Sequence, residues 1–557
     1  MRTFAATALA SSIVSVLLCA CGGSDQAQPP PSDSGVIDSA PSDAGDAGDA
    51  ASDAPTSGTT VTTDKGDVVG VTSSDGKVNA FLGIPYAAAP VGDLRWKPPA
   101  PAPAWTTPRM ATSIGLACPQ VSNALTGAAP PNGEDCLFLN VWTPTSATNA
   151  PVMVFIHGGS FTFGQGGDPL YDGAALSHLG VIVVTINYRL GALGFMAHPA
   201  LSAEDAHGSS GNYGLLDQQA ALGWVKTNIA AFHGDPTKVT IFGESAGAIS
   251  VGAHIVSPLA AGLFSRALSE SGTVYLVTEP LKDPSTPSTV DSAEEYGAAF
   301  ATKLGCTDAS PLACLRGKAV ADILSAQGNS LELTPGVTFS PNVDGYVLPS
   351  SPILRMTAGQ TNDVPYLLGT NADEATLFDS TLTITNDTEY RAAVAAEAPT
   401  LVDSILAIYP SSAYPTPKDA FNAFMTEALF VCPARFVARA SASRVKQTYL
   451  YQYTHVDSVG AALGWGAFHS SELPLVFGNF TGVFSGATDV EKSLSASMMG
   501  YWTRFAATGD PNDPSGAALA WPQYTEAADQ NIVLGDTISV EANLVKDHCD
   551  ALEKLAD

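Results

Sequence analysis

Short apolar runs recur along the chain, and each of them ends in a glycine or a polar turn. They are rich in β-branched and aromatic residues, and polar residues do not alternate with the apolar ones. A run of this length that is apolar on both faces is typical of a strand buried inside a parallel sheet. The runs that predict such strands are Val152–Ile156, Val181–Ile186, Val239–Phe242, Tyr366–Leu368 and Tyr449–Tyr453.

Helix-like stretches lie between these runs, such as Leu215–Asn228 and Ser292–Leu304. Strands that alternate with helices predict an α/β fold around a mostly parallel sheet. The length of 557 residues does not by itself distinguish one large domain from several. No internal repeat or second linker follows residue 60, so we expect residues 61–557 to form one domain.

The first 20 residues have the pattern of an export signal. Arg2 is followed by an uncharged apolar run from Phe4 to Ala20. The run ends in Leu18-Cys19-Ala20-Cys21, which resembles the lipobox of bacterial lipoproteins, in which the Cys after a small residue is acylated and becomes the new N-terminus. We therefore predict lipidation of Cys21; the alternatives are ordinary cleavage and an uncleaved anchor.

Residues 21–60 are predicted to be a disordered tether. After Cys21 they consist mainly of Gly, Ser, Asp, Ala and Pro, with seven Asp and no Lys or Arg. Such a segment has almost nothing to bury, and its like charges repel one another. Behind a lipidated cysteine, it would hold the folded domain away from a membrane surface.

The net charge limits the kinds of partner that we expect, and the cysteine content indicates the compartment of the protein. The net charge of −29 repels phosphate backbones, so we expect no nucleic-acid partner. It can steer cationic substrates, although solubility is the simpler explanation. Without Cys19 and Cys21, six of the eight cysteines remain, an even number that is typical of an exported protein. Their spacing alone leaves the pairing open.

The sequence Gly243-Glu244-Ser245-Ala246-Gly247 is the only Gly-x-Ser-x-Gly in the chain, and it directly follows the predicted strand Val239–Phe242. In a tight strand-to-helix turn, side chains two positions to either side of the serine would clash, which explains both glycines. Such a turn exposes the serine at the carboxyl edge of the sheet. We therefore predict that Ser245 is a nucleophile.

A serine hydroxyl needs a base to attack an ester, and it needs donors for the oxyanion that forms. The loop His157-Gly158-Gly159-Ser160 follows an earlier strand, where glycines let backbone N–H groups face a cavity. The acid and the histidine should come later, in that order. Asp373 and Glu374 are the candidate acids, and His455 and His469 are the candidate bases. The residues alone do not choose between them.

From about Asp64 to Asp550 the chain resembles the type-B carboxylesterases, the family of cholinesterases, liver carboxylesterases and several microbial lipases and esterases. The resemblance rests on long motifs that occur in order along nearly the whole folded part. They begin at Phe81-Leu82-Gly83-Ile84-Pro85-Tyr86-Ala87, Glu134-Asp135-Cys136-Leu137-Phe138-Leu139-Asn140-Val141, Asn187-Tyr188-Arg189 and Gly211-Asn212-Tyr213-Gly214-Leu215-Leu216-Asp217-Gln218. They continue with Phe242 to Gly247, Leu263-Phe264-Ser265-Arg266-Ala267, Gly369-Thr370-Asn371-Ala372-Asp373-Glu374 and Phe468-His469-Ser470-Ser471-Glu472-Leu473.

This resemblance implies an α/β-hydrolase fold, with a mostly parallel twisted sheet and helices on both faces. It implies Glu374 as the acid and His469 as the base, with His157 as part of the loop structure. It also implies oxyanion donors on the backbone of Gly159, Ser160 and Ala246. Many members have a third glycine where this chain has Ser160; since only an N–H is needed, activity should survive, with a narrower acyl site.

The same resemblance implies three disulfides, Cys118–Cys136, Cys306–Cys314 and Cys432–Cys549. It implies a small-molecule ester substrate and no metal or cofactor, and no His/Cys cluster of metal-ligand spacing appears in the sequence. A lipase acting on long-chain triglycerides is the alternative function. A non-catalytic adhesion protein of this family is a remote alternative, because Ser245, Glu374 and His469 are all present.

Overall fold

The computed structural model describes residues 58–122, 127–283, 292–308, 310–328, 339–444 and 447–556. The predicted signal segment, Cys21 and nearly all of the predicted tether lie outside the described residues.

Within this part of the chain, thirteen strands form one sheet, whose centre is parallel. In sheet order, the parallel strands are β7 (Ile182–Ile186), β6 (Ala150–Ile156), β8 (Gly234–Glu244), β9 (Arg266–Glu270), β10 (Tyr366–Asn371), β11 (Thr448–Tyr453) and β12 (Gln530–Leu534). Each of the five predicted runs coincides with one of these strands, except that β7 begins one residue after Val181, so the α/β prediction is confirmed.

Antiparallel strands flank this centre on both sides. They are β1 (Thr59–Thr63), β2 (Gly66–Thr72), β3 (Val78–Pro85) and β5 (Phe138–Pro144) at one side, and β13 (Ser539–Ala542) at the other; β4 (Arg109–Met110) pairs in parallel with β2. The sequence analysis did not predict them. Several of these strands, such as β1 and β13, are only partly buried and lack the continuous apolar run that marks the central strands.

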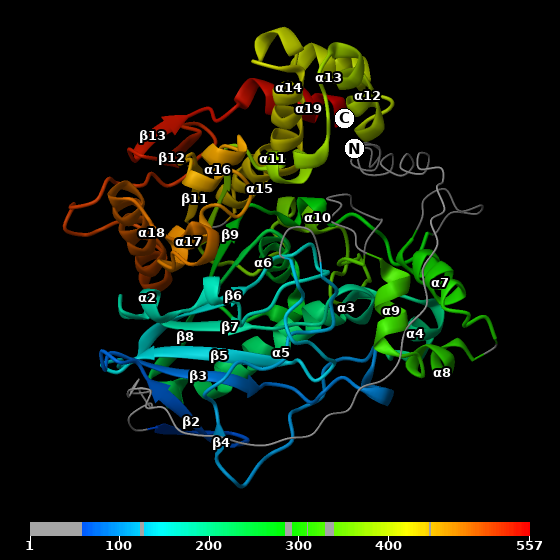
Figure 1. Ribbon diagram of the computed structural model, residues 1–557, viewed down its shortest axis with the longest axis vertical. Helices are drawn as coiled ribbons and strands as arrows, with labels where there is room; N and C mark the ends of the chain where they lie inside the picture. The colour runs from blue at the N-terminus through cyan, green and yellow to red at the C-terminus, as the bar shows by residue number, and fades with distance from the viewer. Residues whose placement is uncertain are drawn as a thin grey trace, which may run out of the picture.

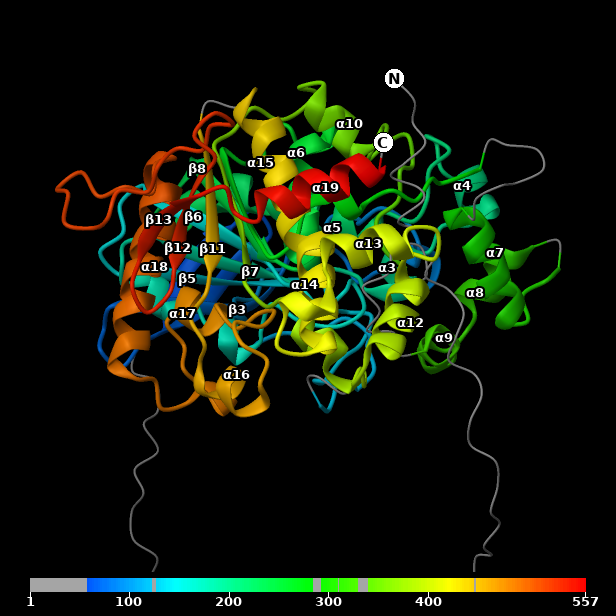
Figure 2. The ribbon, with the colours of Figure 1, turned by 90° about the horizontal axis from the view of Figure 1, so that it is seen from above.

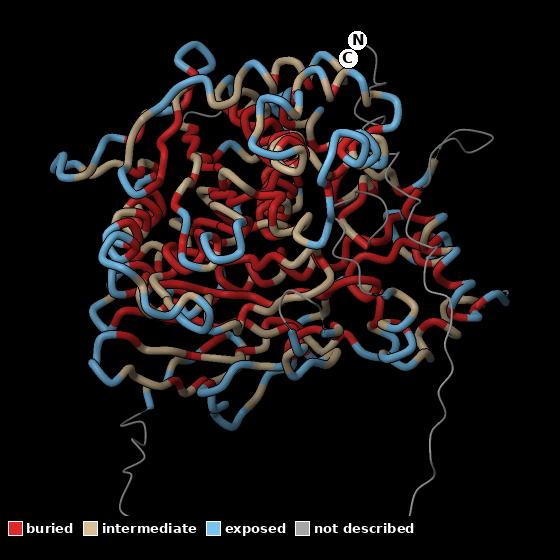
Figure 3. Tube along the Cα trace, turned by 45° about the horizontal axis from the view of Figure 1, so that its top comes forward, coloured by how far each residue is buried: buried red, intermediate tan, exposed pale blue. Residues whose placement is uncertain are grey.

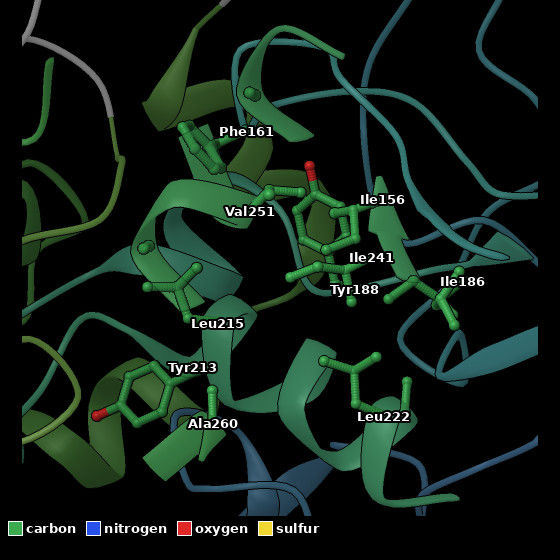
Figure 4. Close-up of a cluster of buried hydrophobic side chains, with 14 of the residues drawn as sticks. Ile156, Phe161, Ile186, Tyr188, Tyr213, Leu215, Leu222, Ile241, Val251 and Ala260 are labelled. Atoms are coloured by element: carbon green, nitrogen blue, oxygen red, sulfur yellow. The ribbon is translucent and has the colours of Figure 1, made fainter. Parts of the chain in front are cut away.

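Helices cover both faces of the sheet, because successive residues of the central strands point to opposite sides. In β6, Val152 and Val154 belong to one core and Met153 and Phe155 to the other. The first core contains α5 (Tyr213–Asn228) and α6 (Ala246–Val256), and the second contains α17 (Leu473–Phe477) and α18 (Asp489–Thr508). Figure 4 shows strand residues such as Ile156 and Ile241 among Leu215, Leu222 and Val251 of the first core. Figure 3 shows the buried strands inside partly exposed helices.

A third, separate core lies among the yellow helices and red α19 at the top of Figure 1. It joins α12 (Asp387–Glu397), α13 (Val402–Ile408), α14 (Pro417–Thr426) and α19 (Lys546–Ala556). The disulfide Cys432–Cys549 links α19 to the start of α15 (Cys432–Ala442). Figure 2 shows α19 lying across α15 and α14.

The remaining α-helices are short. They are α2 (Ala174–Ser177), α3 (Gly191–Phe195), α4 (Pro199–Glu204), α7 (Ala293–Lys303), α8 (Pro311–Arg316), α9 (Val320–Gln327), α10 (Pro352–Thr357), α11 (Ala375–Phe378) and α16 (Ser458–Leu463). None of the helices in the described ranges has both the length and the apolarity to cross a bilayer.

Two further disulfides join Cys118 to Cys136 and Cys306 to Cys314. Together with Cys432–Cys549, these are the three pairs that the family resemblance implies. Disulfides persist in oxidising compartments, whereas cytosolic thiols stay reduced. Three of them are typical of an exported protein.

Candidate active site

Ser245 occupies the one-residue turn between β8, which ends at Glu244, and α6, which begins at Ala246. Its backbone has φ of 55° and ψ of −122°, a conformation that non-glycine residues rarely adopt. Its N–H donates to the carbonyl of Glu270 at 2.9 Å, which ties the turn to the neighbouring strand β9. Ser245 keeps partial exposure, whereas Glu244 and Ala246 beside it are buried. The turn therefore presents the serine at the carboxyl edge of the sheet.

The two glycines of the motif are required by close approach. A Cβ on Gly243 would lie 2.6 Å from the carbonyl carbon of Gly247, and a Cβ on Gly247 would lie 1.9 Å from the carbonyl oxygen of Ile156. Both distances are shorter than any real contact, and backbone atoms have no room to yield. This confirms the prediction that side chains two positions from Ser245 would clash. The clash involves the end of β6 as well as the turn itself.

The glycine-rich loop after β6 lies directly against this turn. A Cβ on Gly158 would come within 3.0 Å of the Ser245 Cβ. Gly159, with φ of 100°, and Ser160, with φ of 50°, both lie in the left-handed region and are both partly exposed. Among the described residues, no backbone carbonyl accepts from the N–H groups of Gly159, Ser160 or Ala246 outside regular helix and strand bonds. These N–H groups are therefore free to bind an anion.

His469 and Glu374 form a buried pair. Nδ1 of His469 lies 2.6 Å from Oε2 of Glu374, and the two residues are 3% and 0% exposed. Glu374 follows β10, and its other oxygen accepts from the backbone N–H of Asn371 at 2.8 Å. His469 comes from the loop between α16 and α17, and Phe378 and Phe430 pack against its ring at centroid distances of 4.9 and 5.2 Å. The imidazole is thus fixed in orientation by a carboxylate and two aromatic side chains.

The other two candidates lie elsewhere. Asp373 accepts from the backbone N–H of Ala467 at 2.9 Å, and so it holds the loop that carries His469 without contacting the imidazole. His455 pairs with Asp536 at 2.5 Å and lines a different cavity. The hydrogen-bond geometry therefore favours Glu374 and His469 over Asp373 and His455.

Glu244 is a neighbour of the imidazole that the sequence analysis missed. Its Oε1 lies 3.1 Å from Nε2 of His469, and it also accepts from the Ser470 hydroxyl at 2.5 Å. The contact is an ion pair without hydrogen-bond alignment, since Nε2 of His469 has no hydrogen-bond partner. The structure therefore does not join Ser245 to His469 by a hydrogen bond. Such bonds often tighten only when substrate binds.

The two carboxylates favour the charged form of His469. Burial by itself lowers the pKa of a histidine, but the negative charges of Glu244 and Glu374 outweigh burial and raise the pKa of His469 above its ordinary value. Burial in turn raises the pKa of Glu244. The site is thus built to stabilise the protonated imidazole.

Two further carboxyls lie deeper. Burial raises the pKa of Glu270 to about 8 and that of Glu472 well above its ordinary range, and the negative charge of Glu244 adds to both shifts. Glu270 accepts from the indole N–H of Trp502 at 3.0 Å, and Glu472 accepts from the Asn371 side chain at 2.5 Å. Glu270 therefore keeps its proton at neutral pH.

His157 belongs to the structure of the loop. Its Nδ1 lies 2.8 Å from the carbonyl of Gly158, and its ring stacks on Tyr188 at 4.5 Å. Burial lowers the pKa of His157 to about 4, which keeps the imidazole neutral. It contacts neither Glu374 nor His469.

Comparison with known proteins agrees with this geometry. A profile of the Carboxylesterase family matches residues 57–552. The para-nitrobenzyl esterase of Bacillus subtilis (strain 168) is 39% identical over 496 residues, which cover 86% of this chain and 96% of that esterase. The cholinesterase of Mus musculus is 34% identical over 510 residues, covering 85% of this chain and 83% of that enzyme. A solved structure of a PNB esterase superposes with a TM-score of 0.76 at 36% identity, covering 88% of this chain and 99% of the other.

The extent of these matches excludes a resemblance limited to the serine motif. They span both sides of the sheet, from the antiparallel strands at the start to α19 at the end. The chain has the α/β-hydrolase fold and is a carboxylic ester hydrolase. This protein belongs to the carboxylesterase family.

Proposed function

We propose that Ser245, His469 and Glu374 are the catalytic residues of this esterase. The observation that carries the proposal is the buried 2.6 Å hydrogen bond between Glu374 and Nδ1 of His469, whose imidazole lies 3.1 Å from Glu244, the residue before the partly exposed Ser245. This bond fixes the imidazole with Nδ1 protonated, which leaves Nε2 able to accept a proton.

In the first half of the reaction, Nε2 of His469 takes the hydroxyl proton as Ser245 Oγ attacks the carbonyl carbon of the ester. Negative charge moves to the carbonyl oxygen, where the N–H groups of Gly159, Ser160 and Ala246 stabilise it. The oxyanion then collapses, the alcohol leaves with the proton from His469, and the acyl group remains on Ser245. Glu374 stabilises the imidazolium throughout.

In the second half, water replaces the alcohol. His469 takes a proton from the water as its oxygen attacks the acyl carbon, and the acid leaves as Oγ of Ser245 regains the proton. Ser160 takes part through its backbone only. We propose that its side chain narrows the acyl site relative to a glycine.

We propose small, uncharged esters as substrates. The relatives include an esterase named for para-nitrobenzyl esters, and p-nitrophenyl esters release a chromophore that makes the comparison simple. A chain-length series from acetate to palmitate separates a carboxylesterase from the alternative, a triacylglycerol lipase. We expect kcat/KM to peak at short acyl chains; a maximum at long chains would favour the lipase.

The direct test of the nucleophile is Ser245→Ala with a fluorophosphonate probe. The wild-type protein should be labelled at one serine and lose activity, and the variant should neither react with the probe nor hydrolyse p-nitrophenyl acetate. The matched control is Ser271→Ala, at another serine of positive φ in the next strand-end turn. Activity of Ser245→Ala near the wild-type value contradicts the proposal.

We further propose that residues 1–20 are an export signal, that Cys21 carries the lipid anchor, and that the segment up to about residue 60 tethers the esterase domain to the cell envelope. Support comes from the uncharged run that ends at Cys21 and from the Asp-rich composition that follows it. Cys21→Ser should abolish labelling by a fatty-acid analogue and release active enzyme from the membrane fraction. A mature N-terminus without lipid, found by mass spectrometry of the wild type, contradicts lipidation.

A further inference from the structure

Ser470, the residue directly after His469, makes a contact that the proposed mechanism does not use. It lies in the loop between α16 and α17, which are orange in Figure 1. Its hydroxyl donates to Oε1 of Glu244 at 2.5 Å. The same oxygen lies 3.1 Å from Nε2 of His469. One carboxylate oxygen therefore contacts both the hydroxyl of Ser470 and the nitrogen that is proposed to act as the base.

The backbone of Ser470 has a conformation that residues with a side chain rarely adopt. Its φ is 70°, in the left-handed region, which glycine reaches without steric cost. Bonds on both sides hold the loop in place, because the carbonyl of Phe468 accepts from the N–H of Ser471 at 3.1 Å and from the side chain of Asn371 at 2.8 Å. A serine at such a position points to a role for its side chain, and the contact that this side chain makes is with Glu244.

The contact between Glu244 and His469 has the length of a hydrogen bond but not its direction. Nε2 of His469 lies 3.1 Å from Oε1 of Glu244, yet it has no aligned hydrogen-bond partner among the described residues. An N–H···O bond weakens steeply as it departs from a straight line. Oε1 instead accepts from the hydroxyl of Ser470. This hydroxyl therefore anchors the carboxylate oxygen beside the imidazole, away from the line along which Nε2 would donate.

The carboxylate of Glu244 lies in surroundings that oppose its charge. Burial raises its pKa; the imidazole of His469 and the hydroxyl of Ser470 act against this rise, and the charge of Glu374 adds to it. Further acidic groups on the surrounding elements interact with Glu244, and burial raises the pKa of each of them. They are Glu270 in β9, Glu472 before α17, Tyr171, Tyr188, and Tyr451 in β11. Since none of these groups can supply a positive charge, the hydroxyl of Ser470 and the imidazole are the groups that stabilise the ionised carboxylate.

We propose that Ser470 is a positioning residue of the esterase reaction, whose hydroxyl keeps the Glu244 carboxylate charged and out of line with Nε2 of His469. This inference rests on the proposed role of His469 as the base. Without the hydroxyl, Oε1 is free to turn toward Nε2 and to share a proton with it. Such a bond exists only when the pair of Glu244 and His469 holds that proton, whichever of the two groups carries it. Loss of the hydroxyl therefore stabilises the protonated pair relative to the unprotonated pair, in which Nε2 is free to accept from Ser245.

Proton NMR of the full chain tests this inference without reference to activity. The proton on Nδ1 of His469, in its 2.6 Å bond with Glu374, should resonate far downfield, and its titration with pH reports the charge of the imidazole. In Ser470→Ala and Ser470→Gly, the midpoint of this titration should rise by about one pH unit. Glycine also removes the constraint on φ, so a rise that both variants share belongs to the hydroxyl. The matched control is Ser209→Ala, which removes a hydroxyl from the carboxylate of Asp344 and should leave the midpoint in place. A midpoint that is unchanged or lower in either folded variant overturns the inference.

Two comparisons show through which residue the hydroxyl acts and whether the reaction depends on it. Ser470→Ala combined with Glu244→Gln should have the same midpoint as Glu244→Gln alone, since the charge on which the hydroxyl acts is then absent. A further rise in the double variant would show another route to His469 and would overturn the inference. In the single variants, the acid limb of kcat/KM for p-nitrophenyl acetate should rise together with the midpoint. If the midpoint rises and the limb stays in place, the contact acts on the imidazole as inferred, and it is the proposed role of His469 as the base that is wrong.

Discussion

Oε1 of Glu244 lies 3.1 Å from Nε2 of His469, the imidazole nitrogen that Glu374 does not bind. The imidazole therefore has a carboxylate at each nitrogen, and one of them belongs to the residue directly before Ser245 in the chain. In the proposed mechanism, proton transfer from Ser245 to Nε2 takes place beside this second carboxylate. The arrangement favours the imidazolium that each half of the reaction creates, and it also sets the pH at which His469 becomes free to act as a base.

Glu244→Gln should move the acid limb of the pH profile. As the proposed base, His469 can act only when neutral, so the acid limb of kcat/KM should report its pKa in the free enzyme. The charge of Glu244 raises that pKa, so its removal should shift the limb to lower pH. The amide oxygen of the variant can still accept from the Ser470 hydroxyl, which preserves the local packing. Glu294→Gln, at a buried carboxylate that pairs with Lys282, is the control and should leave the limb in place. An unchanged limb in Glu244→Gln would show that the carboxylate does not act on His469.

The adjacent acids Asp373 and Glu374 should differ sharply in effect. Glu374→Gln should lower kcat by about three to four orders of magnitude, because the amide no longer holds the imidazole in the correct tautomer. Asp373→Asn keeps an acceptor for the N–H of Ala467 and should cost less than about tenfold. Steady-state kinetics on p-nitrophenyl acetate decides the ranking. The reverse ranking would remove Glu374 from the proposed triad.

The difference between these two acids also illustrates what the sequence alone predicts. The five central runs were identified because strands buried on both faces are apolar throughout, and Gly243 and Gly247 because a tight turn needs them. Asp373 and Glu374 point in different directions after β10. The pattern of apolar and polar residues does not show which of them contacts a histidine 95 positions later in the chain. Only the family resemblance selected Glu374.

Glu244 and the third core were missed for related reasons. The sequence shows that Glu244 stands directly before Ser245. Its carboxylate reaches His469, however, only because the loop after α16 returns to the end of β8. The helices α12, α13 and α14 bury residues against one another and against α19, far along the chain. Such packing depends on contacts between residues far apart in the chain, which a local pattern of apolar and polar residues does not reveal. The disulfide Cys432–Cys549 is the clearest sign of these contacts.

Glu270 should make the protein less stable as the pH rises. Its pKa is raised to about 8, mainly by burial, so between its unfolded pKa near 4.5 and about 8 the folded state holds a proton that the unfolded state loses. The unfolded state then binds fewer protons, and the free energy of unfolding falls with increasing pH across that window. Glu270→Gln keeps an acceptor for Trp502 and should make this decrease in the free energy of unfolding smaller.

Guanidinium unfolding at pH 5, 6.5 and 8 measures the slope of the free energy of unfolding against pH. Glu541→Gln, on the exposed edge strand β13, should leave the slope unchanged; an unchanged slope in Glu270→Gln would show that the proton lies elsewhere.

Choline esters should not be preferred substrates, although the mouse cholinesterase is 34% identical to this chain. In the cholinesterase branch of the family, a tryptophan in the loop closed by the first disulfide holds the quaternary ammonium by a cation–π contact of about 2 kcal/mol when desolvated. Here Cys118 and Cys136 close that loop, and the sequence between them contains no Trp, Tyr or Phe. The acidic surface still attracts a cation from a distance, but long-range attraction raises the encounter rate without forming a pocket.

The sharpest test of this prediction uses two substrates that differ in one atom. Acetylcholine and its carbon analogue, 3,3-dimethylbutyl acetate, have the same shape and differ in charge. We expect kcat/KM for the neutral ester to equal or exceed that for acetylcholine at physiological ionic strength, where the attraction of surface charges is largely screened. The measurement should be repeated at low salt, because steering by the charge of −29 would then raise only the value for acetylcholine. A preference for acetylcholine of more than about tenfold that persists at high salt would require an aromatic side chain from another loop and would overturn the prediction.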